Sequence, residues 1–217
     1  MSRLVDLSHD IGHGTITYPG LPGPVIEDHL GRAESRDHYA PGVEFHIGRI
    51  SMVGNTGTYL DTPFHRFPDG FDLAALELDS AADLPGIVLD PADASLVATD
   101  LGGIDIDGRA VLIRTGWSRH WGTPTYGDQD HPHVTEEAAI ALARGGAALV
   151  GIDSVNIDAT TTGERPAHTI LLKAGIPVVE HLTGLDALPM SGFRFFAVPP
   201  KVQSFGTFPV RAFAIVD

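Results

Sequence analysis

The chain has 217 residues, of which 43% are hydrophobic and 19% are charged, which is enough apolar material for a packed core. We expect one domain spanning residues 1–217. The formal charge of −14 argues against nucleic acid and anionic membranes as partners, because binding to both depends on Lys and Arg. The absence of cysteine excludes disulfides and thiolate chemistry, and no apolar run approaches the ~20 residues of a membrane span. We therefore expect a cytoplasmic protein that acts on a small molecule.

The first quarter of the chain combines two strand-like segments with a long stretch of turn-forming residues. Residues 3–9 and 43–53 have the apolar content and length that predict strands. Residues 11–42 are rich in Gly, Pro and His with little periodicity, so we expect an ordered but irregular loop region. Loops of this length are usually ordered by function or by contact, which suggests a place in an oligomer contact.

Residues 55–65 carry the first candidate site and read Asn-Thr-Gly-Thr-Tyr-Leu-Asp-Thr-Pro-Phe-His. Pro63 disfavours α geometry at the residue before it, so the side chains here must meet through loop geometry and not through helical spacing. Asp61 and His65 offer a carboxylate and an imidazole a short distance apart, suited to metal binding or proton transfer. The alternative is a capping aspartate and a solvated histidine.

The rest of the chain alternates short buried strands with one clear helix. Thr135 followed by two glutamates predicts a helix start, and Gly145-Gly146 predicts its end. Because strands dominate and helices are few, we expect an α/β or α+β fold with a mixed sheet. The strands are expected at residues 110–115, 147–152, 176–180, 193–198 and 211–216.

A second candidate cluster consists of His168 and Glu180. His168 precedes a turn at Ala174-Gly175, and Glu180 ends the strand that follows. The two residues would stand at opposite ends of a hairpin-like unit and could converge on one ion. By sequence alone, a glutamate at a strand end is ordinarily solvated, so this cluster is weaker than the first.

The motif around Asp61 resembles H-x-G-T-H-x-D-x-P-x-H, the signature of the cyclase-like metal-dependent hydrolases, the family of bacterial kynurenine formamidase and isatin hydrolase. The first two histidines are replaced by Asn55 and Tyr59. Further similar blocks run through nearly the whole chain, among them Leu112-Ile-Arg-Thr-Gly-Trp and Ile176-Pro-Val-Val-Glu-His-Leu. The positions that match the signature are Gly57, Thr58, Asp61, Pro63 and His65.

The resemblance implies a compact fold of the swivelling β/β/α type and a hydrolase of amide, formamide, lactam or lactone bonds, similar to kynurenine formamidase. Its metal ligands would be Asp61, His168 and Glu180, with His65 as proton shuttle. The family also lines its pocket with aromatic residues and uses the region of residues 11–42 to complete a neighbour's pocket. That implies a homodimer or a higher homo-oligomer. The candidate substrate contacts are Asn55, Tyr18, Tyr39 and Phe64.

Because two histidines of the signature are replaced, the sequence does not decide whether the site retains a metal ion. Asn55 can ligate only weakly through oxygen, and Tyr59 would need a deprotonated phenol against an ordinary pKa of about 10. A retained site would hold one divalent ion, Zn or Mn, and no organic cofactor is expected. Without metal, Tyr59 and His65 would form an acid–base pair for a metal-independent cyclase or lyase. A third alternative is a non-catalytic small-molecule binding protein.

Three other polar residues have structural interpretations. His9 is expected at the surface, because its spacing matches no ligand motif. Asp153 ends a buried strand and is expected to form structural hydrogen bonds. His181 follows Glu180 directly, so in a regular strand it would point to the opposite face.

Overall fold

A mixed sheet of nine strands forms the centre of the computed structural model, which describes residues 2–93 and 95–217. Its strand order is β1-β11-β9-β5-β6-β7-β8-β4-β10, in which the run from β5 to β8 is parallel and the outer pairs are antiparallel. The expected α/β class with a mixed sheet is therefore confirmed. The strands of this sheet are β1 (Arg3–Asp6), β4 (Tyr59–Asp61), β5 (Leu84–Leu89), β6 (Ala110–Ile113), β7 (Leu149–Ile152), β8 (Val178–Glu180), β9 (Ser191–Phe196), β10 (Thr207–Pro209) and β11 (Phe213–Val216).

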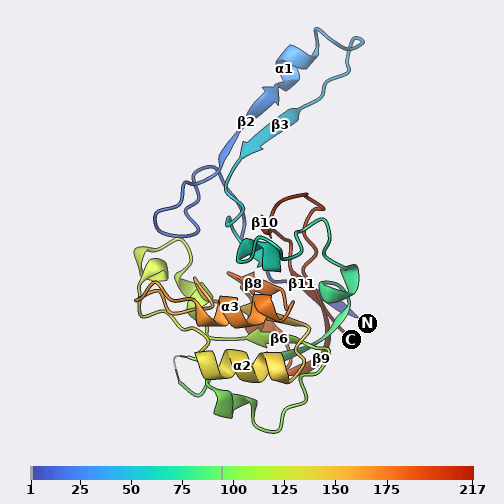
Figure 1. Cartoon of the computed structure of the whole chain (residues 1–217). Helices are drawn as coiled ribbons and strands as arrows, with labels where there is room; N and C mark the ends of the chain where they lie inside the picture. Colours follow the sequence, from blue (N-terminus) through green and yellow to red (C-terminus); the bar gives the residue numbers. More distant parts are fainter. Residues whose placement is uncertain (1, 94) are drawn as a thin grey trace.

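Helices are few, as expected, and two of them cover one face of the sheet (Figure 1). Helix α2 begins after Thr135, whose side chain accepts a hydrogen bond from the backbone N–H of Ala138, and it ends at the predicted glycines. The α-helices are α1 (Arg32–Ser35), α2 (Glu136–Arg144) and α3 (Pro166–Lys173). The 3₁₀ turns are η1 (Pro63–His65), η2 (Leu78–Ser80), η3 (Ala98–Leu101), η4 (Trp117–His120), η5 (Pro124–Gly127) and η6 (Leu185–Ala187).

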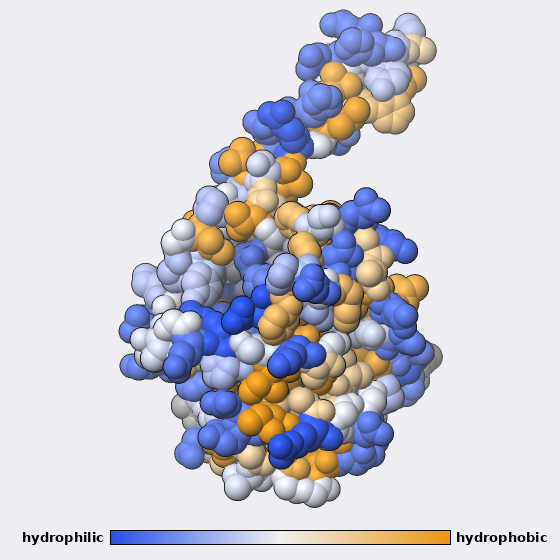
Figure 2. Space-filling model, viewed as in Figure 1, coloured by the Kyte–Doolittle hydropathy of each residue, from blue (hydrophilic) through white to orange (hydrophobic). Residues whose placement is uncertain are grey.

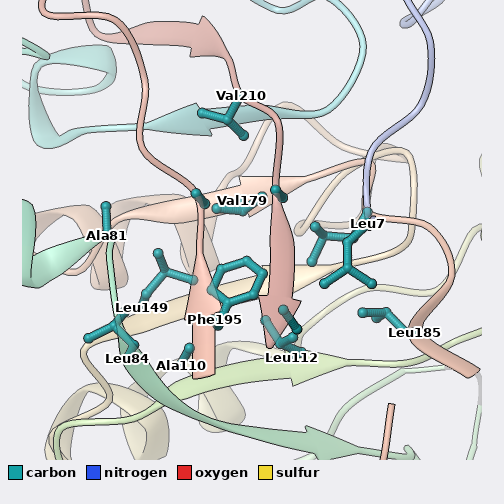
Figure 3. Close-up of a cluster of buried hydrophobic side chains, with 14 of the residues drawn as sticks. Leu7, Ala81, Leu84, Ala110, Leu112, Leu149, Val179, Leu185, Phe195 and Val210 are labelled. Carbon is teal, nitrogen blue, oxygen red and sulfur yellow. The ribbon is translucent and has the colours of Figure 1, made fainter. Parts of the chain in front are cut away.

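The core lies on both faces of the central parallel strands. Along β6, Leu112 belongs to the cluster on one face, whereas Val111 and Ile113 belong to the cluster under α2 and α3. Figure 3 shows the first cluster, in which Phe195 of β9 packs among side chains from several strands. Strands buried on both faces need continuous apolar runs, and such runs allow β6 and β7 to be predicted from the sequence.

The prediction that residues 11–42 form an irregular loop is wrong for part of the segment. Residues 25–30 form strand β2 (Val25–Leu30), which pairs antiparallel with β3 (Ile47–Ser51), and α1 lies between them. Together they form an arm that projects from the body of the molecule (Figure 1). Strand β3 lies within the predicted strand 43–53, whereas β2 is exposed along almost its whole length and lacks the alternation of apolar and polar residues that indicates a half-buried strand.

The hairpin-like unit predicted around His168 is also wrong. His168 lies inside α3, which begins at Pro166 and is followed by Gly175 with a φ of +77°. Proline is favoured in the first turn of a helix, and a glycine with positive φ is favoured just after its end. Pro166 and Gly175 therefore indicate where α3 begins and ends. None of the helices in the described part of the chain has the length and apolar character needed to cross a membrane.

Candidate active site

The sequence-predicted residues meet at the end of the sheet formed by β8, β4 and β10. Strand register places Tyr59 opposite Glu180 and Asp61 opposite Thr207. Because paired residues on neighbouring strands bring their side chains close together, each pair forms a direct contact. His168 joins them from α3, which packs against β8.

Two buried ligand atoms face each other without a hydrogen-bond partner. They are Asp61 Oδ2 and His168 Nε2, which are 3.6 Å apart and are both unpartnered among the described residues. His168 Nδ1 lies 2.6 Å from Asp158 Oδ2, so this nitrogen donates a proton to the Asp158 carboxylate and Nε2 is the atom left to ligate a metal ion. A buried carboxylate oxygen and an imidazole nitrogen this close need a positive charge between them, which is supplied either by a bound metal ion or by a proton on Nε2.

Glu180 approaches the same nitrogen of His168 as Asp61 does. Its Oε1 lies 3.6 Å from His168 Nε2 and also accepts a hydrogen bond from the backbone N–H of Ile157. Its Oε2 accepts a hydrogen bond of 2.6 Å from the Tyr59 hydroxyl. Glu180 is thereby held in place with Oε1 turned toward His168.

His65 stands at the mouth of the site. Its ring centre is 5.9 Å from that of His168, and its side chain is 35% exposed. The Thr207 hydroxyl donates to Asp61 Oδ1, so the Thr207 oxygen accepts from His65 Nδ1–H at 2.8 Å. His65 Nε2 then carries the lone pair, which suits this residue to taking up a proton.

Tyr59 is buried between Glu180 and a second histidine. Its hydroxyl lies 3.3 Å from His181 Nε2, and His181 Nδ1 lies 2.8 Å from the hydroxyl of Tyr126. Since Tyr59 gives its proton to Glu180, His181 donates through Nε2 and accepts through Nδ1 from Tyr126. The phenol is therefore fixed as a hydrogen-bond donor to Glu180.

Burial and neighbouring charges both shift the pKa values of the groups in the site. Burial, followed by the charge of Asp61, raises the pKa of Glu180 to about 7. Burial and then the charge of Glu180 raise the pKa of Tyr59 far above its usual value, which keeps the phenol protonated. For His168, burial acts downward, but the charge of Glu180 and the hydrogen bond to Asp158 outweigh it and raise the pKa.

Neighbouring groups decide the pKa of Asp61, whereas burial decides that of His181. Burial would raise the pKa of the Asp61 carboxyl, but His168, His65 and Thr207 together lower it. Burial lowers the pKa of His181 to about 3, so this histidine is neutral. Asp61 is therefore ionised and His181 is neutral, although both are buried.

A pocket of about 420 Å³ opens above these groups. Tyr18 and Asn55 lie in its wall, as expected for substrate contacts. Phe64 is not among the lining residues, and Tyr39 lies on the arm, where it packs against Phe45. The pocket is lined by Tyr18, Pro19, Gly20, Leu21, Asn55, Tyr59, His65, Arg66, Asn156, Arg165, His168 and Glu180.

Two expectations for other histidines are wrong. His9 is packed with its ring stacked on Trp121 at 4.0 Å, and burial lowers its pKa to about 4. His181 does not point away from the site, because its φ of 57° breaks the strand alternation and turns the ring toward Tyr59. The structural role expected for Asp153 is confirmed, since it accepts hydrogen bonds from the side chain and backbone of Thr115 and from the backbone N–H of Gly116.

Sequence reasoning missed Asp158 and Thr207, which orient the site from outside the motifs. Asp158 accepts from the backbone N–H groups of Ala167 and His168 as well as from the His168 ring. It lies ten residues before His168, beyond the reach of any local capping pattern. Thr207 comes from the last third of the chain and meets Asp61 only through strand pairing.

The donor set suits a divalent metal ion. Asp61, His65 and His168 each offer an atom within 4.8 Å of the others. Ligands about 2.1 Å from a tetrahedral ion lie roughly 3.4 Å apart, close to the distances around His168 Nε2. A carboxylate on the remote nitrogen of a ligating histidine, here Asp158, is the usual arrangement that orients such a ligand.

Comparison with known proteins assigns the chain to a family. A family model described as putative cyclase matches residues 5–159. The chain belongs to the putative cyclase family. It is 29% identical to kynurenine formamidase from Geobacillus thermodenitrificans (strain NG80-2), over 98% of this chain and 97% of that protein.

Solved structures of putative cyclase relatives share the fold. Isatin hydrolase A from Labrenzia aggregata superposes with a TM-score of 0.80 at 26% identity, covering 99% of this chain and 94% of the other. A predicted metal-dependent hydrolase from Bacillus stearothermophilus gives a TM-score of 0.75 at 25% identity, covering 100% of both chains. The chain is accordingly an enzyme of the hydrolase class.

Proposed function

We propose that this protein is a metal-dependent hydrolase of the C–N amide or formamide bond of a small aromatic molecule. The observation that carries the proposal is the facing pair of unpartnered atoms, Asp61 Oδ2 and His168 Nε2, below a pocket of about 420 Å³. The names of kynurenine formamidase and isatin hydrolase among its relatives support the aromatic amide class. A lactam or lactone would fit the same chemistry.

Asp61, His168 and Glu180 would hold one ion, Zn or Mn. When bound, such an ion lowers the pKa of a water and polarises a carbonyl. His65 is the alternative third ligand by distance. Its Nδ1 proton bonds to Thr207, which leaves Nε2 to serve either as a metal ligand or as the proton carrier proposed below. A second ion has no place in this proposal, because Tyr59 fills a position that a histidine holds in the family motif.

The chain's own residues supply proton transfer and orientation. His65 accepts a proton at Nε2 and delivers it to the nitrogen of the leaving amine, while Thr207 keeps its ring in place. Asn55 lines the pocket and offers an amide donor to the carbonyl oxygen of the substrate. Tyr59 fixes Glu180, and Tyr18 provides an aromatic wall for the substrate ring.

Hydrolysis of formanilide by the purified protein tests this function. We expect the protein to contain about one Zn or Mn per chain by elemental analysis, a chelator to remove it, and activity to return on its addition. Asp61→Asn should lose both metal and turnover, while Asp130→Asn, an exposed acid outside the pocket, should keep both.

A variant of His65 shows whether Glu180 or His65 is the third metal ligand. If His65 is the proton carrier, His65→Gln keeps the metal and loses at least about a hundredfold in turnover. Loss of the metal would instead make His65 a ligand. Full activity in metal-free protein would contradict the proposal and favour the metal-independent reaction by Tyr59 and His65. A protein that binds aromatic ligands but turns over no amide or lactone would be a binding protein.

We also propose that the protein is a cytoplasmic homodimer or higher homo-oligomer joined through the arm. A two-stranded ribbon is at best marginally stable alone, and this one exposes a row of apolar side chains (Figure 2). Covering that row with a second copy would bury it and stabilise the strands. The exposed apolar residues of the arm are Val25, Ile26, Tyr39, Val43, Phe45, Ile47 and Ile50.

A further inference from the structure

We propose that His181 and Tyr126 are positioning residues of the active site. They direct the proton of Tyr59 to Glu180 Oε2, so that Glu180 binds a metal ion through Oε1 alone. The inference deepens the proposed function and rests on it only in treating Glu180 as a metal ligand. It starts from a row of three buried side chains that ends on this carboxylate: Tyr126, His181 and Tyr59 are 4%, 0% and 2% exposed.

With Glu180 ionised, each hydrogen bond in this row has one direction. A carboxylate only accepts, so the Tyr59 hydroxyl, 2.6 Å from Glu180 Oε2, donates to it. The Tyr59 oxygen then accepts from His181 Nε2–H at 3.3 Å, and the neutral ring accepts at Nδ1 from the Tyr126 hydroxyl at 2.8 Å. All three protons therefore point toward Glu180, and hydrogen bonds aligned in one direction strengthen each other.

The backbone of His181 is adapted to placing its ring in this row. Its φ of 57° lies in the left-handed region, where residues other than glycine are uncommon and strained. Its N–H donates to the Ser154 carbonyl at 3.3 Å, and its carbonyl accepts from the Thr58 hydroxyl at 2.6 Å. A regular strand would turn the residue after Glu180 to the opposite face, so this conformation is what brings the imidazole beside Tyr59.

Aromatic rings surround the imidazole of His181. The ring centres of Tyr59, Tyr126 and Trp121 lie 5.0, 5.7 and 5.9 Å from it. Because the imidazole is fully buried, each of its nitrogens depends on a protein partner. Neither His181 nor Tyr126 lines the substrate pocket, and Tyr126 lines a neighbouring cavity with Trp121. Their route to the reacting groups is therefore through Tyr59.

The row leaves Glu180 with one oxygen for a metal ion. Oε2 is occupied by the Tyr59 hydroxyl. Oε1 accepts one hydrogen bond, of 2.6 Å, from the backbone N–H of Ile157, and it keeps a second lone pair. That lone pair is available to an ion shared with His168 Nε2, which is 3.6 Å from Oε1.

Tyr126 decides the direction because it supplies the proton at the far end of the row. Without its hydroxyl, the imidazole of His181 would carry its own proton on Nδ1 and accept at Nε2. The proton of Tyr59 would then be divided between His181 and Glu180. Glu180 would lose part of the hydrogen bond that sets the rotation of its carboxylate.

The tautomer of His181 tests this direction without relying on metal or turnover. We expect nitrogen NMR of labelled, chelator-treated parent protein at about pH 8.5, where Glu180 is ionised, to show the proton on Nε2. In Tyr126→Phe, part of the population should carry it on Nδ1. A parent with the proton on Nδ1 would overturn the proposal, because Tyr59 would then donate to His181. A tautomer unchanged in Tyr126→Phe would overturn the role of Tyr126.

Two replacements of His181 distinguish positioning from a purely structural role. Asparagine tolerates a positive φ but is too short to reach Tyr59, whereas glutamine places an amide N–H near the position of Nε2. We expect His181→Asn to bind Zn²⁺ about tenfold more weakly than the parent, and His181→Gln to recover most of that loss. Chelator competition measures both. A structural role predicts the reverse order, because glutamine is the more strained of the two at this φ, and that order would overturn the proposal.

Removal of single hydroxyls provides a matched comparison. Tyr126→Phe should weaken Zn²⁺ binding by up to about tenfold, at the lower end of the range for groups that orient a metal ligand. Thr135→Ala also removes a hydroxyl that forms a hydrogen bond, but outside the pocket, and should leave the affinity unchanged. Equal losses in both variants would mean that general destabilisation is the cause, which would overturn the proposal.

Kinetics at saturating Zn²⁺ separate this inference from the proposed function. With formanilide, Tyr126→Phe should lower kcat by up to about tenfold and leave KM near that of the parent, because Tyr126 does not line the substrate pocket. A raised KM at unchanged kcat would show that the pocket wall had moved and would overturn the positioning role. A parent that hydrolyses no formamide would contradict the hydrolase, while the order of Zn²⁺ affinities would still decide the roles of His181 and Tyr126.

Discussion

His168 connects the metal-binding atoms to a carboxylate that no motif contains. Asp158 accepts the proton of His168 Nδ1 and two backbone N–H groups of α3, so it fixes both the tautomer and the position of the ring. This support decides which nitrogen of His168 faces Asp61.

Replacing Asp158 by asparagine should weaken metal binding while leaving every direct ligand in place. We expect affinity for Zn or Mn to fall by about tenfold to a hundredfold, because the ring loses the charge that increases its basicity. Competition with a fluorescent chelator measures the change, with Asp130→Asn as the control. Unchanged affinity would mean that Asp158 serves only the start of α3.

Restoring the two family histidines should strengthen the metal site. In the double variant Asn55→His and Tyr59→His, two imidazoles replace a weak amide and a protonated phenol, and Glu180 Oε2 loses its Tyr59 partner. We expect the variant to retain zinc through dialysis better than the parent. Equal retention would show that the parent site is already complete. Activity need not follow, because Tyr59 positions Glu180 in the parent.

His9 should make stability depend on pH. Burial lowers its folded-state pKa to about 4, below the value of about 6.5 expected when unfolded. The stabilisation is therefore present above pH 6.5 and is lost as pH falls toward 4, because only the unfolded chain binds the proton readily. The gap in unfolding free energy between parent and His9→Gln should shrink by about 1 kcal/mol from pH 7.5 to pH 5, after allowance for partial exposure. Urea unfolding at fixed protein concentration measures it, and a constant gap would contradict the lowered pKa.

At the scale of the secondary-structure element, short strands position the side chains of the site. Strand β4 has only three residues, all buried, and it pairs with β8 on one side and β10 on the other. The pairing fixes Tyr59 and Asp61 toward their partners with no freedom in register, since a slip by one residue would turn both side chains to the other face.

Helix α2 offers a stability test away from the site. Thr135→Ala removes the side-chain acceptor for the backbone N–H of Ala138 and should destabilise the fold by about 1 kcal/mol. Chemical denaturation measures the loss, and metal content should not change, because α2 contributes no residue to the pocket. The exposed Thr161→Ala provides the control. A loss as large in the control would show that capping is not the cause.

At the scale of the whole molecule, the arm is the one feature that the body of the fold does not stabilise by packing. Its strands pair only with each other and project away from the sheet (Figure 1). The arm is therefore where a second copy would contribute most to stability.

Apolar-to-polar changes on the arm should weaken self-association. Phe45 and Ile50 are 51% and 48% exposed, so Phe45→Ser with Ile50→Ser removes apolar surface without opening a cavity in the core. We expect light scattering at micromolar concentration to show an oligomer for the parent and a shift toward monomer for the variant. Leu78→Ser, 68% exposed on the body, is the control. A monomeric parent would contradict the proposal.

Sequence by itself determined the features that depend on local or periodic patterns. The apolar runs of β6 and β7 mark strands buried on both faces, and Thr135 with the two following glutamates marks the start of α2. The motif at residues 55–65 predicts Asp61 and His65 as site residues, and in the structure they lie in one group with His168 and Glu180.

Only the tertiary structure decided how those residues are supported. Asp158 and Thr207 reach the site through a helix start and a strand register, which depend on packing between segments far apart in the chain. The φ of 57° at His181 and the pairing of β2 with β3 likewise have no local signature, because each is imposed by its surroundings and not by propensity. Short-range rules describe a residue's preference, whereas partners, burial and pKa values arise only when distant segments exclude water together.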